Sequence, residues 1–181
     1  MYIVSKRFEV AGCHSLRLPY QSKCANLHGH NWIVDVEISA DKLNADGMVM
    51  DFTIIKKVVM KLDHSSFNGY TCSECGHHPK GIFPDEINTT AENIAKWIAS
   101  QIQDELDTIF RRDRAEALLL QYGSKQKAVL EESDWDEEDA LDDKQVEILF
   151  NDIVTFSENK LSRVSKITIQ ESEGNVACYI P

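Results

Sequence analysis

Hydrophobic and polar residues alternate along the two ends of the chain, and this alternation predicts β-strands. It covers residues 2–11, residues of about 30–40 and residues 165–180. Successive side chains of a strand point to opposite faces, so this period places the hydrophobic residues on one buried face. Glu173-Gly174-Asn175 interrupts the last stretch and predicts a turn. We therefore expect a strand pair at each end of the chain, the second pair being a hairpin.

Helical spacing replaces the alternation between the two strand pairs. The first helix is predicted after Asp51-Phe52-Thr53, where Asp51 or Thr53 can accept a hydrogen bond from a free amide and cap the helix. The second is predicted after Thr89-Thr90-Ala91-Glu92, which has the form of a capping box. The hydrophobic stripes are Ile54, Ile55, Val58, Val59 and Leu62, and then Ile94, Trp97, Ile98, Ile102 and Leu106. This order predicts an α+β fold, with a four-stranded antiparallel sheet of two hairpins and two helices on one face.

The segment at about 111–162 does not fit this order, and we interpret it as a helical and acidic insertion in a single domain of residues 1–181. Ala115–Tyr122 and residues 144–158 have helical patterns. Between them, residues 131–143 contain nine acidic residues and no basic ones, which is typical of a solvated segment. These acids account for most of the net charge of −11. A negative chain disfavours nucleic acid as a partner.

Other features of the composition indicate the compartment. No run of apolar residues approaches the length of a membrane span, so we expect no membrane partner. Lys6, Arg7 and Glu9 interrupt the amino terminus, which therefore does not fit a signal peptide. The five cysteines indicate a reducing compartment, where thiols bind metals or react rather than pair. We expect a cytoplasmic protein.

Three histidines are candidates for a metal centre. His28 and His30 flank Gly29 at the start of a predicted strand, so their side chains point to the same face. His14 directly follows the first predicted strand, and pairing of the two strands would bring it near the others. Three protein ligands and one open position are the arrangement of a catalytic zinc. Imidazole also suits iron, copper and nickel, so the residues alone leave the metal open.

Four other residues could carry chemistry near such a centre. Cys24 lies four residues before His28, and a thiolate favoured by a nearby dication suits a base or nucleophile. Asp63 could orient His64 and stabilise its protonated form, as in a proton relay. Glu171 ends a strand, and its carboxylate could accept two parallel hydrogen bonds from a planar amidine edge. Each residue also fits a structural role, as a buried thiol, a helix end or an exposed acid.

Several motifs occur together in an order that resembles the 6-pyruvoyl-tetrahydropterin synthase/6-carboxytetrahydropterin synthase family. The resemblance frames residues 1–110 and 163–181. The matching segments are Phe8–Leu16, Cys24–His30, Gly47–Phe52, Leu62-Asp63-His64 with Phe67-Asn68, Thr89–Asn93 and Gln170-Glu171-Ser172. Members of this family have the tunnelling fold (T-fold), so the resemblance implies that fold here.

The resemblance also implies a role for each candidate residue. The residues that would hold Zn²⁺ are His14, His28 and His30. The catalytic residues would be Cys24 as the base and Asp63 with His64 as the proton relay. The residues that would bind a pterin are Glu171 as its anchor, with Thr89 and Thr90 lining the pocket.

The implied reaction converts 7,8-dihydroneopterin triphosphate to 6-carboxy-5,6,7,8-tetrahydropterin, acetaldehyde and triphosphate, a step of 7-deazaguanine (queuosine) synthesis. The short spacing within Cys24–His30 resembles the 6-carboxy branch of the family. The alternative is the pyruvoyl branch, which tends to have a longer spacing and eliminates triphosphate without cleaving the side chain. Subunits of the family assemble around a central barrel, which implies a homohexamer of two trimers with active sites at subunit interfaces.

Two features depart from the family pattern. Cys72-Ser73-Glu74-Cys75-Gly76-His77-His78 has the spacing of a zinc knuckle and fits either a second metal site or an incidental loop. The insertion at about 111–162 fits a tolerated surface insertion, the outside of an oligomer or a segment that binds a partner. Together they leave open a function of another class, that of a non-catalytic metal-binding interaction protein.

Overall fold

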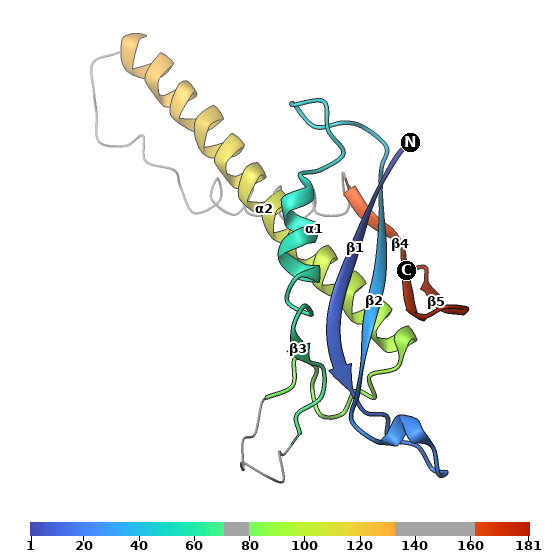
Figure 1. The fold of residues 1–181 in the computed structure, drawn as a ribbon. Coiled ribbons are helices and arrows are strands. Elements are labelled where there is room, and N and C mark those ends of the chain that lie inside the picture. Colours follow the sequence, from blue (N-terminus) through green and yellow to red (C-terminus); the bar gives the residue numbers. More distant parts are fainter. Residues whose placement is uncertain (71–79, 133–161) are drawn as a thin grey trace. The chain divides into compact units, whose positions relative to one another are not determined.

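The fold is built on one mixed β-sheet (Figure 1). The structure, a computed structural model, describes residues 1–70, 80–132 and 162–181. The sheet has the strand order β3-β1-β2-β4-β5. Its strands are β1 (Tyr2–His14), β2 (His28–Ala40), β3 (Ser65–Ser66), β4 (Ser162–Ser172) and β5 (Asn175–Tyr179). The predicted α+β fold and its four antiparallel strands are confirmed. The predicted strand count is one too low, because β3 has two residues and is too short to show an alternating pattern.

Antiparallel pairing sets which residues lie opposite one another. β1 pairs with β2 over its whole length, from Tyr2 opposite Ala40 to His14 opposite His28. Both strands are longer than predicted at the ends that carry histidines. β2 also pairs with β4, which forms the predicted hairpin with β5. Gly174 in that hairpin turn has a φ of 84°, in the left-handed region that favours glycine.

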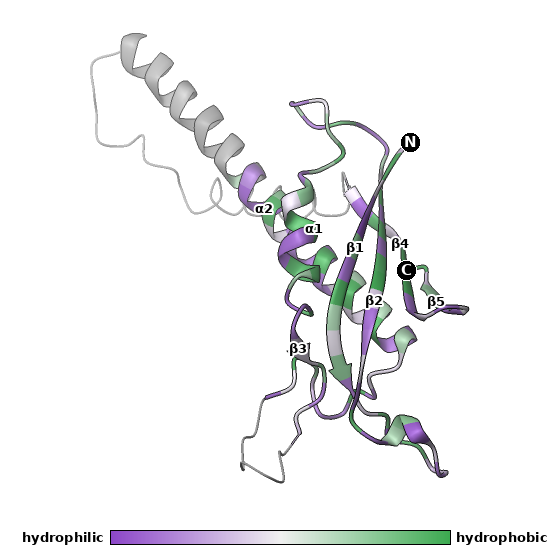
Figure 2. Cartoon of the chain, in the orientation of Figure 1, coloured by the Kyte–Doolittle hydropathy of each residue, from purple (hydrophilic) through white to green (hydrophobic). Residues whose placement is uncertain are grey.

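The hydrophobic core lies between one face of the sheet and two helices (Figure 2). From the sheet it contains Val10, Trp32, Val34, Val36, Ile38, Val164, Ile167 and Ile169. Each of these side chains stabilises the fold by about 1.5–3 kcal/mol when fully buried. The opposite face is more polar and carries ion pairs of Arg7 with Asp35 and of Lys166 with Glu37. The alternation seen in the sequence therefore separates a buried face from a polar one.

Helix α1 (Phe52–Val59) and the first turns of helix α2 (Ala91–Glu132) carry the hydrophobic stripes that were predicted, except that Leu62 lies beyond the end of α1. α1 buries Ile55, Val58 and Val59, and α2 buries Ile94, Ala95, Ile98, Ala99 and Ile102. The side chain of Asp51 accepts a hydrogen bond of 2.8 Å from the amide of Thr53. Of the two caps that the sequence left open, Asp51 and Thr53, Asp51 therefore caps the helix.

The start of α2 differs from the predicted capping box by one residue. The carbonyl of Thr90 accepts the first helical hydrogen bond, from the amide of Ile94, and its hydroxyl accepts one from the amide of Asn93. Thr90 is therefore the cap, and Glu92 is too early in the helix to complete the box. Thr89 is instead fully buried.

Helix α2 runs without a break through the segment that was predicted as a separate helix, Ala115–Tyr122. The segment that we interpret as an insertion therefore begins inside a helix. Contacts divide the chain into two compact units, one formed by Met1–Asp104 with β4 and β5, the other beginning at Glu105. The loop Cys72–His78, the acidic residues from 133 onward and the pattern at 144–158 lie outside the described residues. Among the described helices, none has the combined length and apolar character needed to cross a membrane.

Candidate metal centre

Strand pairing brings the three predicted histidines together at one end of the sheet. His14 lies opposite His28, and Gly12 lies opposite His30. Alternation then directs all three imidazoles to the face that also carries Trp32. The ring centroids are 4.6 Å apart for His14 and His28, 5.3 Å for His14 and His30, and 4.9 Å for His28 and His30.

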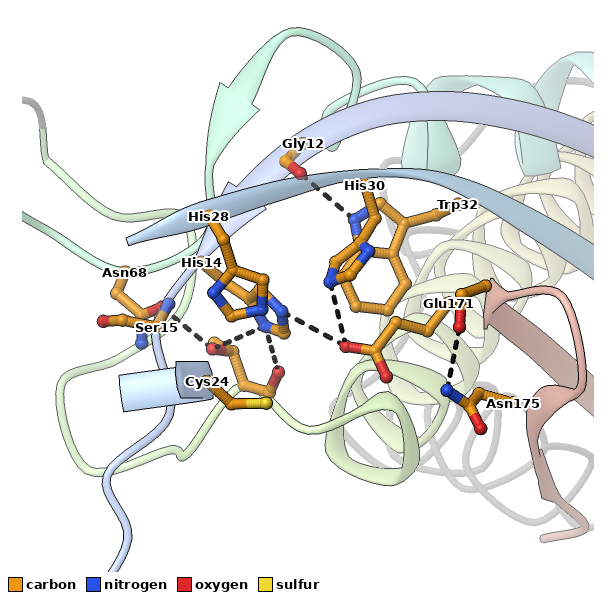
Figure 3. Close-up of polar contacts among 12 residues, drawn as sticks. Gly12, His14, Ser15, Cys24, His28, His30, Trp32, Asn68, Glu171 and Asn175 are labelled. Carbon is orange, nitrogen blue, oxygen red and sulfur yellow. Dashed lines mark hydrogen bonds and ion pairs between the residues drawn. The ribbon is translucent and has the colours of Figure 1, made fainter. Parts of the chain in front are cut away.

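Glu171 completes this cluster from β4 (Figure 3). It lies at a shift in the register between Gln170 and Ser172, the kind of irregularity that re-aims a side chain. One carboxylate oxygen, Oε1, lies 3.3 Å from Nε2 of His14 and 3.2 Å from Nε2 of His30. Ligand atoms of the three histidines and of Glu171 all lie within 4.8 Å of one another.

Backbone carbonyls orient two of the imidazoles. Nδ1 of His14 lies 2.7 Å from the carbonyl oxygen of Thr89, and Nδ1 of His28 lies 2.7 Å from that of Asn26. A carbonyl only accepts hydrogen bonds, so each Nδ1 carries the proton and each Nε2 keeps its lone pair. A backbone carbonyl on the second ring nitrogen is the usual support of a metal-binding histidine.

The electrostatic environment favours the neutral form of His14 and His30. Burial lowers the pKa of His14 below its ordinary value, and nearby His28 and His30 lower it further, against the opposing effects of the Thr89 carbonyl and Glu171. Burial also lowers the pKa of His30. Neutral imidazole is the form that binds metal ions.

The polar atoms of the cluster fit a metal ion. Nε2 of His14 and Nε2 of His30 are buried and have no hydrogen-bond partner among the residues that the structure describes. A buried polar atom without a partner costs about 1–3 kcal/mol, and coordination of a cation would remove that cost. Three imidazoles with one carboxylate suit zinc and other divalent transition metals. The chemistry of this donor set therefore fits the metal centre expected from the sequence.

Two residues without a predicted role, Asn68 and Trp32, contact the histidines or the backbone that positions them. Oδ1 of Asn68 accepts hydrogen bonds of 2.9 Å from the amide of Ser15 and from the hydroxyl of Thr89. Trp32 contacts His14 and His30 edge to face, and its indole nitrogen donates to the carbonyl of Gly12. Asn68 belongs to a segment that matches the family, but nothing in the sequence pattern indicates that it contacts Thr89.

The predicted relay pair lies at the edge of β1. Asp63 and His64 come after the end of α1, not within its last turn. Oδ1 of Asp63 accepts a hydrogen bond of 2.9 Å from the amide of Ala11, and this bond lowers the pKa of Asp63. The other carboxylate oxygen, Oδ2, lies 3.1 Å from Nδ1 of His64. His64 has a φ of 53°, a left-handed conformation that costs about 1–2 kcal/mol. Its ring, 85 % exposed, lines a pocket with Cys13 and Asn31.

Cys24, the predicted base, lies on the short helix η1 (Lys23–Ala25). Its carbonyl accepts a hydrogen bond of 2.7 Å from the amide of Leu16, which ties η1 to the residues that follow His14. The thiol is exposed, and Figure 3 draws it with the histidine cluster. By contrast, the pocket that His64 lines is on another face, because strand alternation directs Cys13 and Asn31 away from the face of the three histidines. Among the described residues, no hydrogen bond or ion pair joins Cys24 to His64.

Of the two threonines predicted to line a pterin pocket, Thr89 is fully buried behind His14 and Thr90 caps α2. The buried side chain of Thr89 is engaged by Asn68. If this segment contacts a substrate, its backbone atoms would make the contact. That Thr89 and Thr90 line a pterin pocket stays a prediction.

Comparison with known proteins identifies relatives of this chain. Residues 3–119 match the family described as "6-pyruvoyl tetrahydropterin synthase". The 6-carboxy-5,6,7,8-tetrahydropterin synthase of Rickettsia felis is 33 % identical over 112 residues, which are 56 % of this chain and 80 % of the relative. The protein of that name from Bacillus subtilis is 25 % identical over 107 residues, 59 % of this chain and 68 % of the relative.

The fold also has relatives among solved structures. The structure of Caenorhabditis elegans 6-pyruvoyl tetrahydropterin synthase superposes with a TM-score of 0.52 at 16 % identity, covering 99 % of this chain and 95 % of the other. That of the Plasmodium falciparum 6-pyruvoyl tetrahydropterin synthase superposes with a TM-score of 0.50, also at 16 % identity, covering 98 % and 96 %. The T-fold that the family resemblance implies is therefore confirmed.

Proposed function

Because the chain belongs to the 6-pyruvoyl tetrahydropterin synthase family, we propose that it is a zinc-dependent carbon–carbon lyase. Its substrates are 7,8-dihydroneopterin triphosphate and water, and its products are 6-carboxy-5,6,7,8-tetrahydropterin, acetaldehyde and triphosphate, in queuosine synthesis. The observation that carries the proposal is the cluster of His14, His28, His30 and Glu171. The names of its relatives and the short spacing of Cys24–His30 support the 6-carboxy reaction.

The proposed chemistry divides between the metal and the side chains around it. Zinc, when bound by the three histidines, supplies a Lewis acid that acidifies the hydroxyls of the substrate side chain. Cys24 removes a proton from a carbon of that side chain. Its exposed thiol, held beside the start of β2, is accessible to a bound substrate. Glu171 orients the pterin by accepting hydrogen bonds from its amidine edge.

The relay of Asp63 and His64 is proposed to act across a subunit interface. Within one chain His64 lines a pocket with Cys13 and Asn31, whose side chains alternation directs away from the face of the three imidazoles. A second copy that presents its His64 to the first copy's Cys24 would complete the site. This need supports the proposed homohexamer of two trimers, in which each site draws residues from two subunits. We propose a cytoplasmic location on the basis of the cysteines.

Analysis of the products tests the proposal. The purified chain, loaded with zinc, is incubated with 7,8-dihydroneopterin triphosphate. We expect acetaldehyde and the carboxylated pterin in equal amounts. Release of triphosphate with a pyruvoyl pterin and no acetaldehyde would favour the pyruvoyl branch, which the description of the matching family supports. Zinc binding without either product would favour a non-catalytic metal-binding protein.

A further inference from the structure

We propose that Glu171 is a fourth metal ligand, which closes the centre in the substrate-free protein. This inference rests on the metal site proposed above and goes beyond the expected role of Glu171 as a pterin anchor. A catalytic zinc usually has three protein ligands and a solvent molecule in the fourth position. In this chain a carboxylate takes the place of that solvent molecule.

The spacing of the ligand atoms is that of a coordination shell. Bonds from zinc to nitrogen and oxygen measure about 2.0–2.1 Å, so neighbouring atoms of a tetrahedral shell are roughly 3.3–3.4 Å apart. Oε1 of Glu171 lies 3.3 Å from Nε2 of His14 and 3.2 Å from Nε2 of His30. A single carboxylate oxygen thus has the separation expected of a ligand from two of the histidines at once.

Hydrogen-bond chemistry leads to the same inference. The proton of His14 is on Nδ1, which faces the carbonyl of Thr89, so Nε2 presents a lone pair toward Oε1 of Glu171. Nε2 of His30 is also buried without a hydrogen-bond partner and faces the same oxygen. Nε2 of His14 and Oε1 of Glu171 are two electron-pair donors that face each other, and they repel unless a proton or a cation lies between them. A divalent cation could bind both of these atoms and Nε2 of His30 at once.

The backbone around Glu171 is suited to this placement. Alternation along β4 puts Glu171 on the same face as Ile167 and Ile169, which are fully buried in the core. The register shift beside it lies next to the β4–β5 turn, where Asn175 donates a hydrogen bond to the hydroxyl of Ser172 (Figure 3). Glu171 therefore lies directly before a turn closed by a hydrogen bond, and 25 % of its side chain is exposed.

The test compares Glu171→Gln with the matched control Glu173→Gln, which removes an exposed acid from the adjacent turn. Zinc affinity of the full chain is measured by competition with a chelator, and coordination by the visible absorption of the Co²⁺-loaded protein. We expect Glu171→Gln to lower zinc affinity by at least about 10-fold, since loss of even an outer partner costs roughly 10–100-fold. Its Co²⁺ spectrum should also change, and Glu173→Gln should match the wild type in both measurements.

Equal zinc affinities and identical Co²⁺ spectra for the wild type and Glu171→Gln would overturn the inference. His14→Gln separates that failure from a failure of the proposed metal site. If Glu171→Gln binds zinc normally and His14→Gln does not, Glu171 is not a ligand and the three-histidine centre still stands. If zinc binding is unaffected by both substitutions, the centre itself is wrong. Thermal unfolding with a chelator present shows that each variant is folded.

Discussion

Nδ1 of His14 lies 2.7 Å from the carbonyl oxygen of Thr89, 75 residues further along the chain. This contact joins the end of β1 to the residue before the cap of α2. It fixes the tautomer of His14 and thereby aims Nε2 at His30 and Glu171. The geometry of the candidate metal centre therefore depends on the packing of α2 against the sheet.

Substitution of Asn68 should weaken the centre without touching a ligand. Oδ1 of Asn68 accepts from Ser15 and Thr89, so Asn68→Ala leaves two donors unpaired and frees the Thr89 segment to move. We expect stability to fall by about 1–3 kcal/mol and zinc affinity to fall by about 10–100-fold. Asn68→Asp keeps the acceptor and is the control. Urea unfolding and chelator competition measure the two effects, and wild-type values for Asn68→Ala would contradict the prediction.

Two glycines of the β1–β2 hairpin should respond differently to substitution by alanine. A Cβ on Gly12 would lie 2.5 Å from Cζ of Phe67, a fully buried ring that contacts Trp32. Gly12→Ala should therefore cost about 1–3 kcal/mol through overpacking. A Cβ on Gly29 would have its nearest neighbour at 3.6 Å, so Gly29→Ala should be tolerated. Denaturant unfolding of the metal-free variants distinguishes the two, and equal losses of stability would show the packing argument to be wrong.

The metal-free fold should lose stability as the pH falls below the ordinary histidine pKa of 6.5. Burial lowers the pKa of His14 and His30 in the folded state below that value. Between 6.5 and the lowered pKa values, the unfolded chain binds more protons than the folded chain, so each step down in pH favours unfolding. Above 6.5 both states are neutral at these residues and the effect ends.

Urea unfolding with a chelator, from about pH 7.5 to about pH 5, measures this dependence. His14→Gln, which has no titrating ring at that position, should show a smaller loss of stability over the same interval. A wild-type unfolding midpoint that stays constant, or a variant as sensitive to pH as the wild type, would be inconsistent with the buried neutral histidines.

Cys24→Ala should bind zinc normally and lose turnover. The thiol is exposed and is not in a disulfide within the described part of the chain, so neither stability nor metal content should change. Loss of a proton-transfer group typically lowers the rate by about 10²–10⁴-fold. Cys178→Ala, at an exposed cysteine of β5, is the matched control and should keep full activity. Acetaldehyde formation and bound zinc are the two readouts, and an active Cys24→Ala enzyme would rule out the base.

Mixed oligomers should test the relay across subunits. Cys24→Ala and His64→Ala chains should each be inactive alone, because each lacks one group of every site. If Cys24 and His64 of different subunits meet, co-assembly should produce some sites with both native residues and restore part of the activity. Separately purified variants that are mixed without exchange of subunits are the control. Activity that stays absent after verified co-assembly would argue against a shared site.

Much of the centre could be predicted from the sequence because strand alternation is a local property. The period of two in Trp32–Ile38 and in the strand before His14 indicates which side chains share a face. It thereby places His14, His28 and His30 together once the two strands pair. The same local reasoning narrowed the cap of the first helix to Asp51 or Thr53, and the structure has Asp51. For the second helix this reasoning placed the cap at Thr89, whereas the structure has it at Thr90, because either of two adjacent threonines can act as a cap.

Tertiary structure alone decided the rest. Glu171 faces His14 and His30 because β4 pairs with β2 and shifts its register beside that residue. Thr89 supports His14 because α2 packs on the sheet, and no spacing along the chain encodes that distance. Asp63 and His64 precede a short strand that no alternating pattern reveals, at the edge of β1. The sequence thus determined which residue types carry the chemistry and which face each strand presents, whereas long-range packing decided which of them meet.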